Sequence, residues 1–492
     1  MKRSLFTFCW FFVVAVTLGS ARPAKAQTPD RSVPPPVGPA PRVTLPPIHT
    51  FTLSNGLSVW VVEKHQVPLV QALLLVEAGQ AYERPGQYGL ADLTADMLDE
   101  GAAGRSALEL SDAIDYLGAR FSVSASDFLT TVGLRVPTER FEEALGLMAD
   151  VTLRPDFPEA DLERLRLQRL TEMLRRHDEP TEIAGAMLYQ TLFGKDHPYA
   201  RYPLGREDDL RRFTTDDLRA FYAAHYGPAR AALIVVGDVT PDEVMPKLEA
   251  ALGAWTSEAG PSNPDVPVVP QVTGRTVYLV DKPGAAQSVI RIGRIGPGRD
   301  TGDYYAIQVM NTILGGSFTS RLNQNLREDK GYTYGARSSF DMRRKQGAFV
   351  AGADVQTAVT GPSLAEFMKE LRGIREPIPA EEVDRAKNFL AMRFPANFQA
   401  VRQVAGRLAE LENFDLPLDS YEKYTDGILA VTGEAVAEAA RKYVDPDNLV
   451  LVVVGDRSVI EEQVRAQGLG PVKILSVTDV LGAPPEFSGE SD

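Results

Sequence analysis

Two aspartates on one face of a short helical segment are the first residues that could do chemistry. In GLADLTADMLDEGA (89–102) the apolar spacing predicts an amphipathic helix that buries one stripe, formed by Leu90, Leu93, Met97 and Leu98. Asp92 and Asp96 are four residues apart, so they share a face beside that stripe, with Ala95 between them. Carboxylate oxygens are ligands of hard cations such as Ca²⁺ and Mg²⁺. These two carboxylates are therefore candidate cation ligands.

The nitrogen and sulfur ligands of transition metals do not occur in a metal-binding pattern. The five histidines have neither H-x-x-x-H nor H-x-x-E-H spacing, and we assign none of them to a metal: His49, His65, His177, His197 and His225. The single cysteine, Cys9, lies in an apolar leader, so the mature chain is expected to have no thiol, disulfide or cysteine-based metal site. No metal bound by this chain through histidine or cysteine is therefore expected.

The first 26 residues have the three parts of a secretion signal. Lys2 and Arg3 are basic, residues 5–18 are apolar, and residues 24–26 (Ala-Lys-Ala) form a small-x-small cleavage site. A single membrane anchor is the alternative, but the apolar run is short for a spanning helix. We therefore expect export across the inner membrane to the periplasm.

The charge of the chain excludes some partners. The formal charge is −14, and removal of residues 1–26 takes away four basic residues and no acidic ones, which makes it −18. An acidic surface disfavours nucleic acid and anionic membranes as partners. The remaining sequence has no apolar run of membrane-spanning length, so we expect no stable membrane insertion.

The globular part of the chain repeats itself once. Three segments recur in the same order, at offsets of 218, 221 and 218 residues: VWVVEK (59–64) as VYLVDK (277–282), FPEADLER (157–164) as IPAEEVDR (378–385), and IVVGD (234–238) as VVVGD (452–456). A period of this length indicates duplicated domains rather than a solenoid of short repeats. The chain is then divided into six parts: a signal peptide (1–26), a proline-rich leader (27–48), an N-terminal lobe (49–256), a linker (257–274), a C-terminal lobe (275–480) and a flexible tail (481–492).

Each lobe is expected to have an α+β fold, with a mainly antiparallel sheet packed against helices. Strands with hairpin spacing occur within 119–136, and a long helix is predicted over about 159–176. Thr214 and Asp217 have the spacing of a helix cap. The basic run MRRK (342–345) is expected to be a solvated hairpin tip.

This organisation resembles the pitrilysin/insulinase-type peptidases, the inverted-zinc-motif family that includes mitochondrial processing peptidase and the core proteins of the respiratory chain. The first lobe of that family reads roughly G-x-A-H-x-x-E-H-M-x-x-x-G, and residues 89–101 here read G-L-A-D-L-T-A-D-M-L-D-E-G. The resemblance puts Asp92 and Asp96 in the positions of the two zinc-binding histidines and Ala95 in that of the catalytic glutamate. Glu172, in DLERLRLQRLTEM, matches the third ligand.

By this resemblance one zinc ligand of three is kept and the general base is lost. Zinc hydrolysis needs a metal that lowers the pKa of a bound water and a group that takes the proton from that water. Ala95 has no proton acceptor, and three carboxylates favour a hard cation over zinc. The chain is therefore expected to bind no zinc and to have no peptidase activity by itself.

The C-terminal lobe has a segment that resembles the substrate-binding motif of the same family. GGSFTSRLNQNLREDKGYTYGA (315–336) resembles the form G-x-x-S-R-L-x-x-x-x-R-E-x-x-x-x-x-Y, with Ser317 at the position of the glycine. The resemblance assigns Arg321 and Tyr334 to holding the substrate backbone and stabilising the oxyanion. A cation and a phenol suit this role because both donate hydrogen bonds where carbonyl charge develops.

Together these features imply a non-zinc, substrate-binding subunit of a heteromeric zinc metallopeptidase. The expected partner is a homologous subunit that has H-x-x-E-H and carries the zinc, and the expected substrate is a peptide. The peptide would lie as an added strand on a sheet edge. In a catalytic lobe this edge would be the strand at 121–126, and in this chain a purely architectural role of that strand is the alternative. The alternative is a catalytically inactive binding or structural protein of the same fold, analogous to the respiratory-chain core proteins, and a homodimer would favour it.

Overall fold

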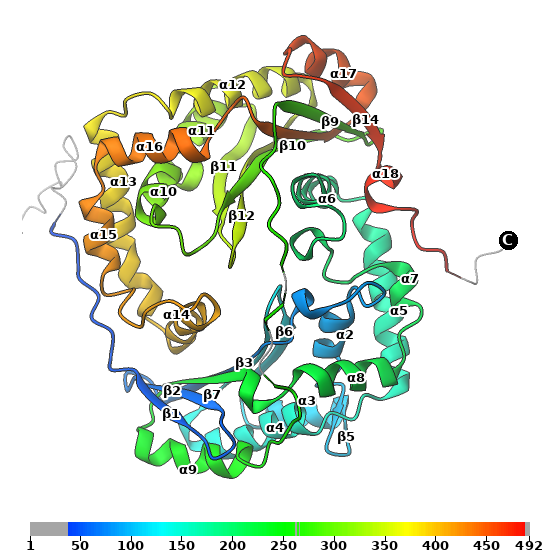
Figure 1. Cartoon of the computed structure of the whole chain (residues 1–492), viewed down its shortest axis with the longest axis vertical. Coiled ribbons are helices and arrows are strands. Elements are labelled where there is room, and N and C mark those ends of the chain that lie inside the picture. Colours follow the sequence, from blue (N-terminus) through cyan, green and yellow to red (C-terminus); the bar gives the residue numbers. More distant parts are fainter. Residues whose placement is uncertain (1–37, 261–262, 265, 488–492) are drawn as a thin grey trace, which may run out of the picture. The chain divides into compact units, whose positions relative to one another are not determined.

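Figure 1 shows the computed structural model, which describes residues 38–260, 263–264 and 266–487. The predicted secretion signal (1–26) lies outside the described residues. From Ala40 onward the chain forms one compact unit, which contains two six-stranded sheets with their helices. The expected α+β fold with two lobes is therefore confirmed. Within the described ranges, no helix is both long enough and apolar enough to cross a bilayer.

The N-terminal lobe is built on a sheet with the strand order β1-β2-β8-β3-β7-β6. Neighbouring strands are antiparallel except β2 and β8, which are parallel. The hairpin of β6 and β7 confirms the one predicted within 119–136, and it places β6 at an edge of the sheet. The strands are β1 (His49–Thr52), β2 (Ser58–Glu63), β3 (Leu69–Val76), β6 (Arg120–Ala125), β7 (Thr130–Pro137) and β8 (Ala231–Gly237).

The helices of this lobe follow the periodicity of the sequence. The long helix α5 has the predicted bounds, and Asp217 N–H donates to Thr214 Oγ1 at 3.3 Å, which confirms the predicted cap of α8. The helices are α2 (Leu90–Asp96), α3 (Ala107–Tyr116), α4 (Phe141–Leu153), α5 (Glu159–Arg176), α6 (Pro180–Phe193), α7 (Glu207–Leu210), α8 (Thr215–His225) and α9 (Pro241–Leu252), with a small hairpin of β4 (Gly101–Ala102) and β5 (Arg105–Ser106).

The C-terminal lobe repeats this plan. Its sheet has the order β14-β9-β13-β10-β12-β11, with β9 parallel to β13 and β14 and the other pairs antiparallel. The run from β9 to β11 therefore has the order and sense of the run from β2 to β6, as a duplicated lobe requires. The strands are β9 (Arg275–Asp281), β10 (Gln287–Pro297), β11 (Thr333–Asp341), β12 (Gln346–Gln356), β13 (Leu449–Gly455) and β14 (Val472–Ser476).

The helices of the C-terminal lobe include two π-helical turns in the segment that contains the predicted substrate-binding motif. These turns are η5 (Thr312–Gly316) and η6 (Gln324–Asp329). The helices are α10 (Tyr304–Asn311), α11 (Arg321–Asn323), α12 (Thr360–Gly373), α13 (Ala380–Arg393), α14 (Val401–Asn413), α15 (Tyr424–Ala430), α16 (Gly433–Tyr443), α17 (Arg457–Ala466) and α18 (Val477–Leu481).

Each lobe contributes one helix to the sheet of the other lobe. Helix α6 packs against β10 and β13, and α14 packs against β3 and β8. The strands β8 and β13 are apolar along nearly their whole length and are buried on both faces, so each needs cover on two sides. At Gly293 a Cβ atom would lie 3.1 Å from a methyl group of Leu188, so glycine lets α6 approach the sheet closely. The two lobes therefore share an apolar core.

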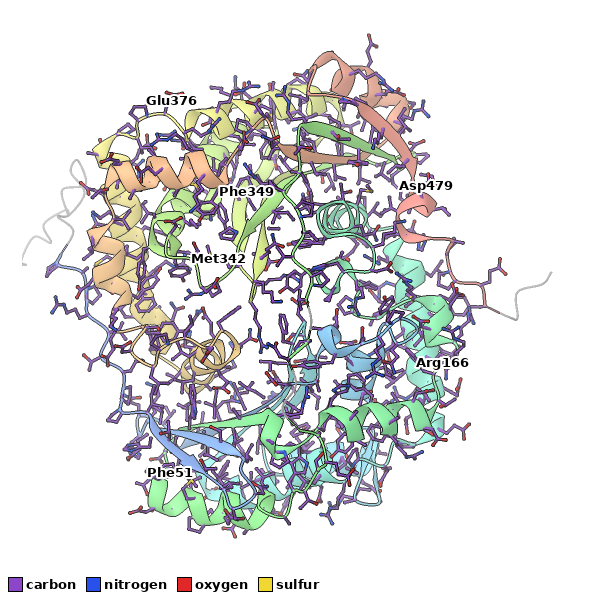
Figure 2. All side chains as sticks on the ribbon, in the orientation of Figure 1. Phe51, Arg166, Met342, Phe349, Glu376 and Asp479 are labelled. Carbon is purple, nitrogen blue, oxygen red and sulfur yellow. The ribbon has the colours of Figure 1, made fainter. Side chains whose placement is uncertain are left out.

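The tip of the β11–β12 hairpin is packed between side chains of the other lobe, so the expectation of a solvated tip is wrong. Met342, labelled in Figure 2, begins this tip. Arg343 is 19% exposed, and its Nη1 donates to Asp127 Oδ2 at 2.7 Å. The guanidinium carbon of Arg344 lies 4.2 Å from the centroid of the Phe128 ring. Two of the three basic residues of the tip, Arg343 and Arg344, thus bind partners on the turn between β6 and β7.

Replacing Arg343 by Ala is expected to lower the free energy of unfolding by about 3 kcal/mol, because the mostly buried Asp127 carboxylate loses its cation. Urea unfolding followed by circular dichroism measures the change. Arg457→Ala is the matched control, since Arg457 pairs with Glu461 on the same exposed helix at 2.6 Å. This control is expected to unfold like the wild type. Equal stability of the two variants would contradict the role of the hairpin tip.

Candidate functional site

Helix α2 is fixed by a buried carboxylate at its N-terminus. Glu83 Oε1 accepts hydrogen bonds from the N–H groups of Gly89 at 2.9 Å and Ala91 at 3.0 Å. Arg201 Nη1 donates to Glu83 Oε2 at 3.2 Å. Gly89 has a φ of +94°, and a Cβ atom there would lie 2.6 Å from the Leu204 carbonyl oxygen, so only glycine fits this turn. These contacts set the direction in which α2 presents its side chains.

The carboxylates of α2 lie at the border between the core and solvent. The predicted apolar stripe is confirmed, because each of its members is at most 1% exposed: Leu90, Leu93, Met97 and Leu98. Ala95 is also fully buried. The side chains of Asp92 and Asp96 are 16% and 41% exposed. Both aspartates therefore lie on the shared face that their spacing predicted.

An arginine from α5 lies between the two aspartates. Arg169 Nη2 donates to Asp92 Oδ1 at 2.9 Å and to Asp96 Oδ2 at 2.5 Å. The Arg169 side chain is 3% exposed. The sequence does not single out Arg169, because in LERLRLQRL it is one of several arginines on an amphipathic helix. Its place one turn before Glu172 is the signal that could have identified it.

Burial governs the protonation of the carboxylates around α2. It raises the pKa of Asp92 to about 6, and the charge of Arg169 opposes this shift. It also raises the pKa of Glu83 to about 7, against the hydrogen bond from Ala91 and the charge of Arg201. In such surroundings a charged carboxylate needs a nearby cation or hydrogen-bond donors. Arg169 provides the cation for Asp92.

The residues around this pair do not fit a metal ion. Glu172, the expected third carboxylate, is 45% exposed and pairs with Arg175 at 3.1 Å. Over the part of the chain that the structure describes, no group of three or more His, Cys, Asp or Glu is placed to hold a metal. The point on which side chains at Asp92 and Asp96 converge is filled by a nitrogen of Arg169. The three predicted carboxylates therefore do not come together as a cation site.

The histidines have structural contacts. His177 ends α5, where its Nδ1 lies 3.0 Å from the Met173 carbonyl oxygen. His197 Nε2 lies 2.9 Å from the Pro267 carbonyl oxygen. Burial lowers the pKa of His225 to about 4, so this ring is neutral at physiological pH. These rings serve packing and backbone contacts.

Arg321, one of the two residues assigned to substrate binding, is held by its own chain. Its Nε donates to Glu382 Oε2 at 2.8 Å and its Nη2 donates to Glu382 Oε1 at 3.2 Å, which ties α11 to α13. Its Nη1 donates to the Gly373 carbonyl oxygen at 3.0 Å. The side chain is 20% exposed. To bind a substrate, the Arg321 guanidinium would have to release Glu382.

Tyr334, the other assigned residue, is 91% exposed. It lies on β11, where the pairing with β12 is irregular between Thr333 and Ala336. No other described residue bonds its hydroxyl group. Arg321 and Tyr334 line two surface hollows, and within the described residues no hydrogen bond joins the two side chains.

A second arginine of the same segment is more accessible. Arg327, on η6, is 37% exposed, and within the described ranges its ion pair is with the adjacent Glu328 at 3.4 Å. Its guanidinium carbon lies 4.6 Å from the centroid of the Phe318 ring. The motif contains two arginines, and their spacing does not tell which guanidinium is accessible to a substrate. Arg327 was therefore not predicted from the sequence. Arg327 is therefore a candidate cation beside Arg321.

The two sheets differ in how their edge strands are closed. On β11, Ala336 N–H donates to Asn323 Oδ1 at 3.3 Å, and the Ser338 carbonyl oxygen accepts from Asn311 Nδ2 at 3.1 Å. These side chains occupy backbone groups that an added strand would need. On β6, the described structure pairs the backbone of 120–125 with β7 and with nothing else. The open edge is thus β6, the strand for which the sequence left both a peptide-binding and a purely architectural role open.

Two family models match the chain. Residues 58–201 match the model described as insulinase (peptidase family M16), and residues 212–390 match the model described as peptidase M16 inactive domain. Curated relatives include an uncharacterized zinc protease of Mycobacterium leprae, which is 27% identical over 336 residues, covering 68% of this chain and 74% of the relative. The uncharacterized zinc protease YmxG of Bacillus subtilis is 25% identical over 344 residues, covering 69% of this chain and 82% of the relative.

Solved structures have the same fold. The peptidase M16 inactive domain from Pseudomonas fluorescens superposes with a TM-score of 0.77 and 26% identity, covering 83% of this chain and 98% of that one. A protease from Helicobacter pylori gives a TM-score of 0.75 at 22% identity, covering 84% of this chain and 100% of that one. With both lobes matched in sequence and in fold, the chain belongs to peptidase family M16.

Proposed function

We propose that this chain is the substrate-binding subunit, with no zinc of its own, of a secreted heteromeric zinc metallopeptidase. Its partner would be a homologous chain with H-x-x-E-H and a bound zinc ion. The observation that carries the proposal is the Arg169 guanidinium between Asp92 and Asp96, in a lobe of an M16 peptidase. With Ala95 at the base position and a guanidinium between the two aspartates, this lobe would lack both a metal site and a proton acceptor at the place where the family activates water.

The C-terminal lobe supplies what the partner would use. The Tyr334 hydroxyl is solvent-exposed and has no bonding partner among the described residues, so it can donate to a carbonyl oxygen that gains charge during hydrolysis. Arg321 or Arg327 would provide the positive charge beside it. The β6 edge could hold an extended peptide through backbone hydrogen bonds. Export rests on the signal pattern of 1–26, which also makes the periplasm the proposed location.

Reconstitution tests this proposal. The chain is mixed with a homologous subunit that has H-x-x-E-H, for example one encoded beside it, and cleavage of a quenched-fluorescent peptide library is measured. We expect no turnover by this chain alone, and chelator-sensitive turnover together with a stable complex when both chains are present. A partner whose motif glutamate is replaced by Gln is the control for contaminating peptidases. Full activity of the partner alone would contradict the proposal.

A second function has support from the same structure. Arg321 is bound to Glu382 and the β11 edge is capped by asparagines, and both features suit a lobe that no longer takes part in hydrolysis. The chain would then be an inactive binding or structural protein that holds peptides at β6. A stable homodimer, together with no gain of activity on mixing with any H-x-x-E-H homologue, would favour this alternative.

A further inference from the structure

We propose that Arg169 is a built-in cation that takes the place of a metal ion between α2 and α5 and excludes metals from that position. The inference concerns this chain alone. It holds whether or not a partner subunit exists, so its failure and the failure of the proposed function are distinguishable.

The geometry puts one nitrogen atom at the point where two ligand positions converge. Arg169 Nη2 lies 2.9 Å from Asp92 Oδ1 and 2.5 Å from Asp96 Oδ2. Two side chains that bind one metal ion direct their ligand atoms at a common point, and here that point is filled by the end of a side chain. Because Arg169 is anchored on α5 and is 3% exposed, this cation cannot diffuse away as an ion would.

Arg169 has no second set of partners to which it could move. Its buried Nε and Nη1 atoms have no hydrogen-bond partner among the described residues, so the two aspartates are its polar anchors. A metal ion that entered would leave a buried guanidinium without a carboxylate, which is strongly unfavourable.

Two changes therefore separate this lobe from a zinc-binding one. The first is the loss of imidazole ligands at Asp92 and Asp96, and the second is the presence of Arg169. Histidines at positions 92 and 96 alone are then not enough for zinc binding, because the positively charged Arg169 guanidinium still repels the metal ion. Removing the guanidinium as well should reopen the position. Glu172, one turn along α5, would then have to leave Arg175 to become the third ligand.

The first test restores the zinc motif in two backgrounds, with and without Arg169→Leu. The restored motif combines Asp92→His, Ala95→Glu and Asp96→His. Zinc per chain is measured by mass spectrometry after dialysis, and circular dichroism checks the fold. We expect less than about 0.1 zinc per chain when Arg169 is present and about one when it is replaced. Stoichiometric zinc with Arg169 in place would overturn the proposal, and so would a folded Arg169→Leu form that binds none.

The second test keeps the native aspartates and does not depend on the restored motif folding. Arg169→Leu frees the two carboxylates, and Arg166→Leu is the matched control. Arg166, labelled in Figure 2, is a buried arginine of the same helix whose Nη2 donates to the Phe213 carbonyl oxygen at 2.6 Å. We expect millimolar Ca²⁺ to raise the Tm of Arg169→Leu by about 2 °C. The Tm of the wild type and of Arg166→Leu should not change when Ca²⁺ is added. If the Tm of Arg169→Leu does not change either, the proposal is overturned.

Discussion

Replacing Tyr334 by Phe is expected to lower the kcat of the reconstituted peptidase about 100-fold, the loss typical of removing one donor to an oxyanion. The Tyr334 side chain is 91% exposed and its hydroxyl is unbonded within the described chain, so the change should not affect folding. KM should change little, because the donor acts on charge that develops during the reaction. Steady-state kinetics and the Tm of each variant check the result.

Tyr116→Phe is the matched control for this prediction. Tyr116 is also well exposed, at 76%, but it lies on α3 of the N-terminal lobe. Its variant is expected to keep wild-type kcat. A reconstituted pair that tolerates the loss of both Tyr334 and Arg321 would contradict the substrate-binding role.

The same assay identifies the arginine that acts with Tyr334. Arg321→Ala removes the contacts with Glu382 and Gly373, so it should lower Tm as well as kcat. Arg327→Ala removes a half-exposed side chain, so a loss of kcat in this variant with unchanged Tm would mark Arg327 as the cation that contacts substrate. The comparison separates a positioning effect from a direct contact.

The second large effect is expected on stability, from Arg169→Leu. The variant should lose about 3 kcal/mol of unfolding free energy, because two carboxylates remain at a partly buried position without their cation. This expected loss of stability lies at the lower end of the range for breaking a buried ion pair, because the Asp96 side chain is 41% exposed. Urea unfolding of the single variant measures this loss.

Removing the carboxylates of Asp92 and Asp96, which have lost their cation, should restore most of the stability. In the Arg169→Leu background, Asp92→Asn and Asp96→Asn leave no uncompensated carboxylate, so the expected recovery is more than half of the loss. A double-mutant cycle built from these variants gives the coupling energy directly. An additive cycle, with no coupling between Arg169 and the two aspartates, would contradict the account of this site.

Local patterns in the sequence predicted much of the fold. The amphipathic period of 159–176 gave both ends of α5, and the Thr214 and Asp217 spacing gave the cap of α8. The stripe beside Asp92 was also correct. These features depend on residues within a few turns of one another, so a single segment contains the information that determines them.

The features that the sequence analysis missed depend on contacts between distant segments. Arg169 meets Asp92 across 77 residues, and Arg343 meets Asp127 across 216. Nothing in the period of α5 tells which arginine points at α2, because several arginines share that helix. The exchange of α6 and α14 between the lobes likewise follows from burying both faces of central strands, which only the assembled sheets require.

The spacing of the motif carries no information on side-chain geometry, so it also left the substrate-binding pair unsettled. The motif contains Arg321 and Arg327, and the sequence analysis took the first. The structure shows Arg321 bound to Glu382, while Arg327 is half-exposed and pairs with its neighbour Glu328. The availability of a donor is a property of its surroundings, so it could not be inferred from the motif.

The most direct test of the central claim is the metal content and turnover of the purified chain expressed without any partner. The account predicts far less than one zinc ion per chain and no peptide cleavage that a chelator abolishes. One zinc ion per chain, together with chelator-sensitive turnover in a homogeneous sample, would contradict it.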